Sequence, residues 1–133
     1  MEMKISFAGG QRIDAGFDGF TVRTDQPTTA GGGGTAPSPF DLFLASVGTC
    51  TAYYVLRFCQ TRGLPTDDVH VTLRATRDEA AHRVTRMDVQ VDLPQNFPAE
   101  LVAACARAAE SCAVKRHLET PPAIVVSASR RSA

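Results

Sequence analysis

The sequence predicts an α+β fold with the element order βββ-α-ββ-α-β in a single domain spanning residues 1–133. Three observations support it. A long apolar segment between Ser38 and Gly63 has capping residues at both ends, as a helix does. On either side of it lie segments in which apolar and polar residues alternate, as in half-buried strands. Neighbouring segments are joined by short turns, which favours antiparallel hairpins and therefore α+β instead of a doubly wound parallel sheet.

Three short strands are predicted before the helix, over residues 3–8, 12–17 and 20–24. The dipeptide Asp18-Gly19 between the last two is a strong hairpin signal. Residues 25–37 contain four consecutive glycines and cannot form regular structure. No Gly-Lys-Ser/Thr follows them, so a flexible lid or linker is expected instead of a phosphate-binding loop.

The central helix is predicted over residues 38–63. Ser38 suits the N-cap, Asp41 stands three residues later in capping-box spacing, and Gly63 suits the C′ position. No charged residue occurs between Leu42 and Leu56, and apolar side chains fall on nearly every face. Such a helix is expected to be buried. The uncharged run is shorter than the roughly 20 residues of a membrane span, and a chain of this size would need a second subunit to cover it.

After the helix, alternation predicts two long strands over residues 69–77 and 83–93, joined by a turn at 78–82. A second helix is expected over residues 99–115, because its apolar residues form one stripe. Two prolines at 121–122 would stop it, and residues 123–129 are predicted to form a final strand before a frayed tail at 130–133.

Composition excludes several classes of function. Acidic and basic residues balance at 14 each, so the positive surface of a nucleic-acid-binding protein is not expected. No signal-like or lipidation segment is apparent, and we expect a cytoplasmic protein with free cysteines, no membrane partner and no nucleic-acid partner. The cysteines form no C-x-x-C pair and the three histidines are scattered, so we expect neither a metal nor another cofactor.

The four cysteines divide by helical geometry. Cys105 and Cys112 would share a face of the second helix, whereas Cys50 and Cys59 would face opposite ways on the first. A redox pair would therefore have to join one helix to the other. For each thiol the alternative is a small buried apolar side chain, which we favour for Cys59 and Cys105. Cys112 precedes the basic segment 115–117, whose charge would lower the pKa of its thiol.

Two segments together resemble the OsmC/Ohr family, the osmotically inducible and organic hydroperoxide resistance proteins. They are SPFDLFLASVGTCTAYYVLRFCQTRG at 38–63 and AAESCAVKRHL at 108–118. The resemblance implies an intertwined homodimer with central helices packed together and antiparallel sheets outside. It also implies a thiol peroxidase of the oxidative stress response. Cys50 would attack an organic hydroperoxide and become a sulfenic acid, and Cys112 would resolve it to a disulfide that a dithiol reductant, such as a lipoylated protein, reopens.

The family also supports its reactive thiolate with an arginine from the N-terminal strands and a glutamate near the start of the central helix. Phe40 occupies the glutamate's position here, and Asp41 is the nearest acid. Arg12 and Arg23 are the candidates for the arginine, and Ala113 replaces the proline that often follows the second cysteine. These departures favour an OsmC-like paralogue. They leave open a small-molecule-binding or redox-sensing protein without efficient peroxidase turnover.

Overall fold

The computed structural model describes residues 1–130 and contains two compact units. The first unit comprises residues 1–49 and 73–89, and the second comprises residues 50–72 and those from 90 onward. The unit boundaries fall inside three continuous elements, namely α1 (Pro39–Gln60), β4 (His70–Asp78) and β5 (Arg83–Asp92). One helix and one hairpin therefore supply residues to both units.

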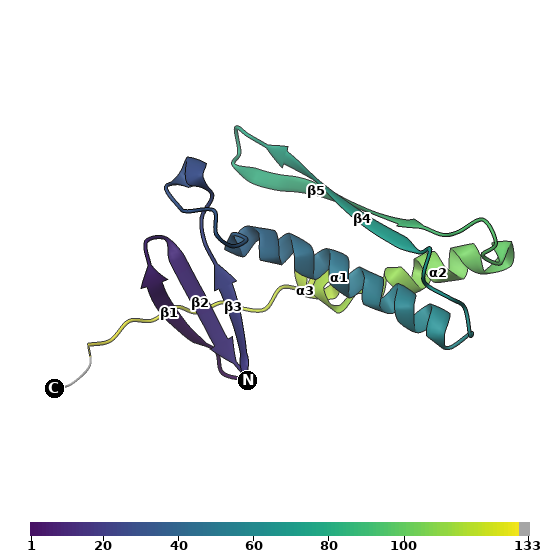
Figure 1. Ribbon diagram of the computed structural model, residues 1–133, viewed down its shortest axis with the longest axis horizontal. Helices are drawn as coiled ribbons and strands as arrows, with labels where there is room; N and C mark the ends of the chain where they lie inside the picture. The colour runs from purple at the N-terminus through teal and green to yellow at the C-terminus, as the bar shows by residue number, and fades with distance from the viewer. Residues whose placement is uncertain (131–133) are drawn as a thin grey trace. The chain divides into compact units, whose positions relative to one another are not determined.

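The N-terminal sheet of the first unit has the antiparallel order β1-β2-β3, which confirms the three predicted strands (Figure 1). The hairpin between β2 and β3 turns at Asp18 and Gly19, where Phe17 pairs with Phe20. Both turn residues have positive φ, 47° and 81°. Two consecutive positive φ values are what a tight two-residue hairpin requires, so the Asp-Gly signal was sufficient. The strands are β1 Lys4–Gly9, β2 Arg12–Phe17 and β3 Phe20–Thr24.

The glycine-rich loop after β3 is organised around the carboxylate of Asp25, which is 1% exposed. Asp25 accepts hydrogen bonds from the Thr35 amide at 3.0 Å, the Thr35 hydroxyl at 2.7 Å and the Gln26 amide at 2.8 Å. A side chain at Gly32 would place its Cβ 1.9 Å from the Gln26 carbonyl oxygen, so only glycine fits there. The loop is therefore held around the buried Asp25 carboxylate by hydrogen bonds. The sequence predicted only a flexible lid or linker here. A short 3-10 helix, η1 Thr28–Ala30, lies within it.

Helix α1 begins and ends with the predicted caps. The Asp41 carboxylate accepts from the Ser38 amide at 2.9 Å and the Ser38 hydroxyl at 2.7 Å, while the Asp41 amide donates to the Ser38 hydroxyl oxygen at 3.2 Å. This is a reciprocal capping box. At the other end Gly63 has φ 63° and the Leu64 amide donates to the Cys59 carbonyl at 3.0 Å, as in a Schellman motif.

Helix α1 was predicted to be buried on all sides, but one of its faces is exposed in the single chain. A stripe at helical spacing stays exposed along the helix, formed by Ala45, Thr49, Tyr53 and Leu56, and Tyr53 is 53% exposed. The opposite face carries the buried Val47 and Val55. By length and composition α1, including the charged residues near its ends, also satisfies the criterion for a membrane span, with mean hydropathy 1.4. The core helix of a soluble protein can satisfy the same criterion.

The core of the second unit joins the C-terminal half of α1 to the segments after residue 90. Its buried members are Val55, Phe58, Cys59, Phe97, Cys105 and Ala109. The prediction of one continuous helix over residues 99–115 is wrong, because two separate helices occupy this region. A 3-10 turn η2 (Ala99–Leu101) leads into α2 (Val102–Ala109), and a separate α3 (Ala113–Glu119) follows. The break falls at Cys112, whose ψ of 122° is not helical.

The hairpin of β4 and β5 forms the second sheet, as predicted (Figure 1). The final strand expected over residues 123–129 is not formed, so the observed order ends in α2 and α3 without a closing β-strand. Ile124, Val125 and Val126 are 87–89% exposed. Their β-branched side chains favour an extended backbone, but a strand also needs a neighbouring edge, and within residues 1–130 none pairs with this segment. Most of the tail expected to fray lies outside the described residues.

Candidate functional site

Cys112 occupies the junction between α2 and α3 and serves as the N-cap of α3. Its sulfur accepts a hydrogen bond from the Lys115 amide at 3.5 Å, the position that a serine or aspartate oxygen takes in an ordinary N-cap. The side chain is 1% exposed. The non-helical backbone at Cys112 therefore places an enclosed thiol at the start of α3.

The tertiary structure brings Cys50 of α1 to Cys112. Cys112 forms side-chain hydrogen bonds with Cys50 and with its neighbour Thr51. Thr51 is 7% exposed, whereas Cys50 is only partly buried. Both cysteines are free thiols. Of the two residues, Cys112 at the helix junction is the more enclosed.

The pKa of Cys112 lies below its ordinary value of 9.0. Burial by itself would raise this pKa, because a thiolate loses hydration in an apolar interior. Hydrogen bonds to the sulfur outweigh that effect, since donors stabilise the thiolate more than the thiol. In decreasing order of effect, these hydrogen bonds involve the Lys115 amide, the Cys50 and Thr51 side chains, and the Val114 amide.

The lowered pKa of Cys112 was expected from the charge of the basic segment 115–117. Lys115 and Cys112 do interact electrostatically, but hydrogen bonds to the sulfur are the larger causes of the lowered pKa. The Lys115 ammonium forms a salt bridge with Glu110 and lies 4.0 Å from Glu119. His117 makes a 2.7 Å hydrogen bond between its Nδ1 and the Ala113 carbonyl oxygen. The thiolate is thus stabilised chiefly by backbone amides and hydroxyl or thiol donors, which a charge pattern in the sequence does not reveal.

Cys59 and Cys105 lie in the core of the second unit, with 0% exposure each. Burial raises the pKa of both thiols, and a nearby Arg62 offsets the effect only in part. A neutral, enclosed thiol is a poor nucleophile. Both residues are the small buried apolar side chains that their positions predicted.

Asp41 is engaged in the capping box. The Ser38 hydroxyl and amide lower the pKa of the Asp41 carboxyl, with a smaller contribution from Arg77. The neighbouring Phe40 packs against the Phe43 ring at 5.3 Å, and the Arg77 guanidinium lies 5.9 Å above the Phe40 ring centroid. The start of α1 therefore holds an aromatic side chain and a helix-capping acid.

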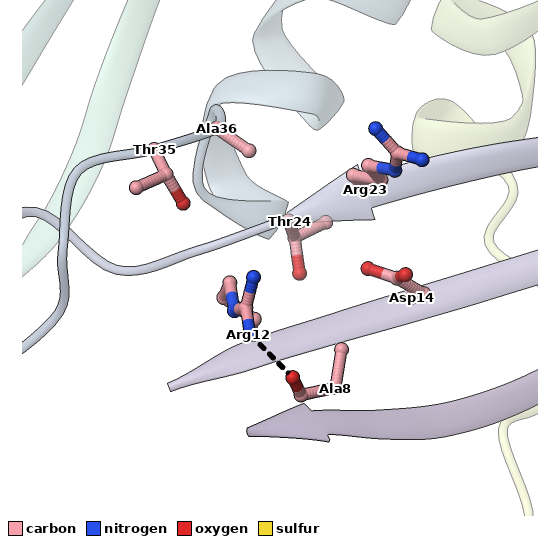
Figure 2. A pocket seen from close by; sticks show the side chains of 7 residues that line it. All are labelled: Ala8, Arg12, Asp14, Arg23, Thr24, Thr35 and Ala36. Carbon is pink, nitrogen blue, oxygen red and sulfur yellow. Dashed lines mark hydrogen bonds between the residues drawn. The ribbon is translucent and has the colours of Figure 1, made fainter. Parts of the chain in front are cut away.

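Arg12 and Arg23 line one pocket of the first unit, with a volume of about 420 Å³ (Figure 2). Arg12 donates to the Ala8 carbonyl at 2.6 Å and to the Gly9 carbonyl at 3.3 Å. Its guanidinium therefore stabilises the turn between β1 and β2. Arg23 stands opposite Asp14 in the β2–β3 register. The remaining lining residues are Ala8, Asp14, Thr24, Thr35 and Ala36.

Among residues 1–130 no cluster of three or more histidine, cysteine or acidic side chains is placed to hold a metal ion.

Comparisons with known proteins identify relatives by family and by fold. A family profile described as OsmC-like protein matches residues 31–127, which is more than half of the chain. No curated protein gives a match.

Three solved structures share the fold at low sequence identity. One is a protein of Psychrobacter arcticus 273-4 named for osmotic stress and detoxification, with TM-score 0.74, 19% identity and coverage of 86% of this chain and 85% of that one. An OsmC-like protein of Mycoplasma pneumoniae has TM-score 0.70 and 10% identity over 90% and 87%. An organic hydroperoxide resistance protein OsmC of Legionella pneumophila has TM-score 0.56 and 21% identity over 89% of each chain. The predicted α+β fold is thereby confirmed.

Proposed function

Because the chain belongs to the OsmC-like protein family, whose role is related to peroxides, we propose that it reduces organic hydroperoxides with the thiols of Cys50 and Cys112. The name of the Legionella pneumophila structural neighbour, an organic hydroperoxide resistance protein, supports this substrate class. The observation that carries the proposal is the hydrogen bond between the partly buried Cys50 and the enclosed Cys112. An accessible thiol beside a second thiol is the arrangement that thiol peroxidation and resolution require.

The chemistry has two steps in the protein. The Cys50 sulfur attacks the terminal peroxide oxygen, an S–O bond forms, the O–O bond breaks, and the alkoxide takes a proton and leaves as an alcohol. The Cys112 sulfur then attacks the Cys50 sulfur of the sulfenic acid, the S–S bond forms, and hydroxide leaves as water after protonation. A dithiol reductant, such as a lipoylated protein, supplies two electrons and two protons to reopen the disulfide. A reducing cytoplasm is the compartment in which we propose that this cycle runs.

The supporting residues follow from the resemblance. One arginine of the N-terminal strands would stabilise the Cys50 thiolate, and Arg12 and Arg23 are both retained for this role. Of the two, Arg23 is the better candidate, because the guanidinium of Arg12 is already bound to the carbonyls of Ala8 and Gly9. Asp41 is the weakest candidate for a supporting acid. Its carboxylate already accepts hydrogen bonds from the Ser38 amide and the Ser38 hydroxyl in the capping box.

A homodimer is part of the proposal. The exposed stripe of α1, defined above, is uncharged and follows helical spacing, so it suits burial against the same stripe of a second copy. Tyr53 and Leu56, 53% and 37% exposed, would supply most of the apolar contact. The exposed apolar residues 124–126 are a second surface that a partner could cover.

The test is to add cumene hydroperoxide to the reduced protein and follow the thiols by mass spectrometry. The wild type should lose two thiols and gain one disulfide joining Cys50 and Cys112. Cys50→Ser should consume no hydroperoxide, and Cys112→Ser should stop at the sulfenic acid. Cys59→Ala serves as the matched control, because Cys59 lies in the core. Survival of both thiols, or equal loss in Cys50→Ser, would overturn the proposal.

Phe40, at the position of the family's glutamate, favours a second candidate in which the same dithiol senses oxidants or binds a small molecule without turnover. A sensor would form the disulfide once and would not be recycled efficiently by a dithiol reductant. Multiple turnovers with lipoylated protein, measured as alcohol formed per protein chain, distinguish the enzyme from this alternative. A ligand-induced rise in melting temperature without peroxide consumption would favour the binding protein.

A further inference from the structure

We propose that the pocket of the first unit binds a small acidic amino acid, which is a ligand with two carboxylates and one ammonium group. This site goes beyond the proposed thiol chemistry, because no cysteine lines the pocket. Three features of the pocket support it: charged side chains that share one face of the N-terminal sheet, lining segments that are held in place, and the balance of charge in the lining (Figure 2).

Three charged side chains lie on the same face of the N-terminal sheet. Arg12 and Asp14 are two residues apart on β2, and Asp14 stands opposite Arg23 of β3. Side chains alternate between the two faces along a strand, and residues opposite one another share a face. The intervening residues of β2, Ile13 and Ala15, therefore belong to the other face. The sheet thus separates an apolar face from a charged one, and all three charged side chains line the pocket.

Two of the segments that line the pocket are held in place by hydrogen bonds. The Arg12 guanidinium donates to the Ala8 carbonyl at 2.6 Å and to the Gly9 carbonyl at 3.3 Å. Thr35, from the glycine-rich loop, donates to Asp25 through its amide at 3.0 Å and its hydroxyl at 2.7 Å. A site whose lining is already ordered binds a ligand at a smaller cost in entropy. The glycine-rich loop thus supplies one preorganised wall of the pocket.

The charges in the pocket are not paired with one another. Within residues 1–130, no ion pair joins Asp14 to Arg12 or to Arg23. Arg23 is exposed, whereas Asp14 is half-buried. A carboxylate that has lost part of its hydration is stabilised when a cation approaches it. The pocket therefore offers guanidinium groups to an anion and an unpaired carboxylate to a cation.

The polar atoms of the lining define the ligand. The two guanidiniums suit carboxylates, which arginine can bind with two parallel hydrogen bonds. The Asp14 carboxylate suits an ammonium group, and the Thr24 hydroxyl, which donates to the Ile13 carbonyl at 2.7 Å, keeps an oxygen that can accept. The complement of two cations and one anion is a molecule with two anions and one cation. Glutamate and aspartate have this charge pattern at neutral pH, and a volume of about 420 Å³ lies in the range of small-molecule sites.

The test is isothermal titration calorimetry of the reduced full chain with L-glutamate and with L-aspartate. The wild type should bind at least one of them, at one site per chain. In Arg23→Gln the affinity should fall at least about tenfold, because a hydrogen bond between two charged groups is lost. Arg83→Gln is the matched control and should bind as the wild type does, since Arg83 is exposed in the first unit outside the pocket. Melting temperatures establish that each variant is folded.

Asp14→Asn tests recognition of the ammonium group. Glutarate and succinate are the analogues of glutamate and aspartate that lack this group. The wild type should prefer the amino acid to its analogue, and Asp14→Asn should abolish that preference. A preference retained in Asp14→Asn, or an affinity unchanged in Arg23→Gln, would overturn the proposal. No binding of either amino acid at millimolar concentration, or equally tight binding of inorganic phosphate, would overturn it as well.

This site and the proposed peroxidase function are tested separately, because the titrations contain no hydroperoxide. Arg23 is also the better candidate to stabilise the Cys50 thiolate, and a guanidinium bound to a ligand carboxylate is withdrawn from that role. A saturating amino acid should therefore slow the consumption of cumene hydroperoxide by the wild type. Binding without any slowing would remove Arg23 from the thiol chemistry and leave the amino-acid site supported.

Discussion

The side chains of Cys50 and Cys112 are hydrogen-bonded, although Cys50 lies within α1 and Cys112 lies at the junction of α2 and α3. Thr51, the next residue on α1, forms a side-chain hydrogen bond with Cys112 as well. Two consecutive residues of α1 thus contact the thiol that caps α3, and both contacts lower the pKa of Cys112.

Replacing Thr51 with valine should raise the pKa of Cys112. Valine has the shape of threonine but lacks the hydroxyl that is hydrogen-bonded to Cys112, so one of the contacts that lower the pKa is lost. NMR titration of protein labelled at the cysteine β-carbon measures the pKa residue by residue. Thr49→Val is the matched control, because the Thr49 hydroxyl is exposed and donates to the Ala45 carbonyl at 2.8 Å. An unchanged Cys112 pKa in Thr51→Val would contradict the described geometry.

Acid should weaken the first unit through Asp25. The Thr35 hydroxyl and amide, with smaller contributions from Gln26 and Gly33, lower the pKa of Asp25 from 3.8 to about 2 against the effect of burial. Because the pKa is lower in the folded chain, the stabilisation is present above about pH 4 and is lost as the pH falls through about 2. Urea unfolding at several pH values should show this loss in the wild type and a smaller one in Asp25→Asn. An identical acid dependence in both proteins would exclude Asp25 as its source.

Replacing Gly48 with alanine should stabilise the protein by about 0.5–1 kcal/mol, because glycine is costly inside a helix. An added Cβ would meet the Leu73 side chain, at 3.8 Å and 3.9 Å. Those are ordinary van der Waals distances. The midpoint of urea unfolding measures the change. A decrease in stability would instead show that a second chain packs its backbone against Gly48.

An acidic residue at Tyr53 should dissociate the proposed homodimer. Tyr53→Asp would place a charge in the middle of the exposed stripe of α1, and burying an unpaired charge in an apolar interface is costly. Sedimentation velocity should then show a monomer at concentrations where the wild type is a dimer. Gln90→Asp on β5 is the control, since Gln90 is exposed outside that stripe. A wild-type monomer would remove this interface from the proposal.

Local sequence determined most of the elements of this protein. Asp18-Gly19 fixed a hairpin, because few residues accept two positive φ values in succession. Ser38 and Asp41 set the start of α1, and Gly63 set its end, because each cap acts on backbone groups within one turn. Alternation located five strands within one or two residues, since strand periodicity is a property of consecutive side chains.

Tertiary structure decided the features that depend on residues distant in sequence. The apolar stripe over 99–115 is compatible with one helix, but a non-helical backbone at Cys112 interrupts it and the thiol becomes a cap. Residues 123–129 have strand propensity and remain unpaired within the described chain, because propensity cannot supply a neighbouring edge. Helical spacing showed only that a thiol pair must join two helices. Which two thiols meet follows from long-range packing, which brings α1 against the junction of α2 and α3.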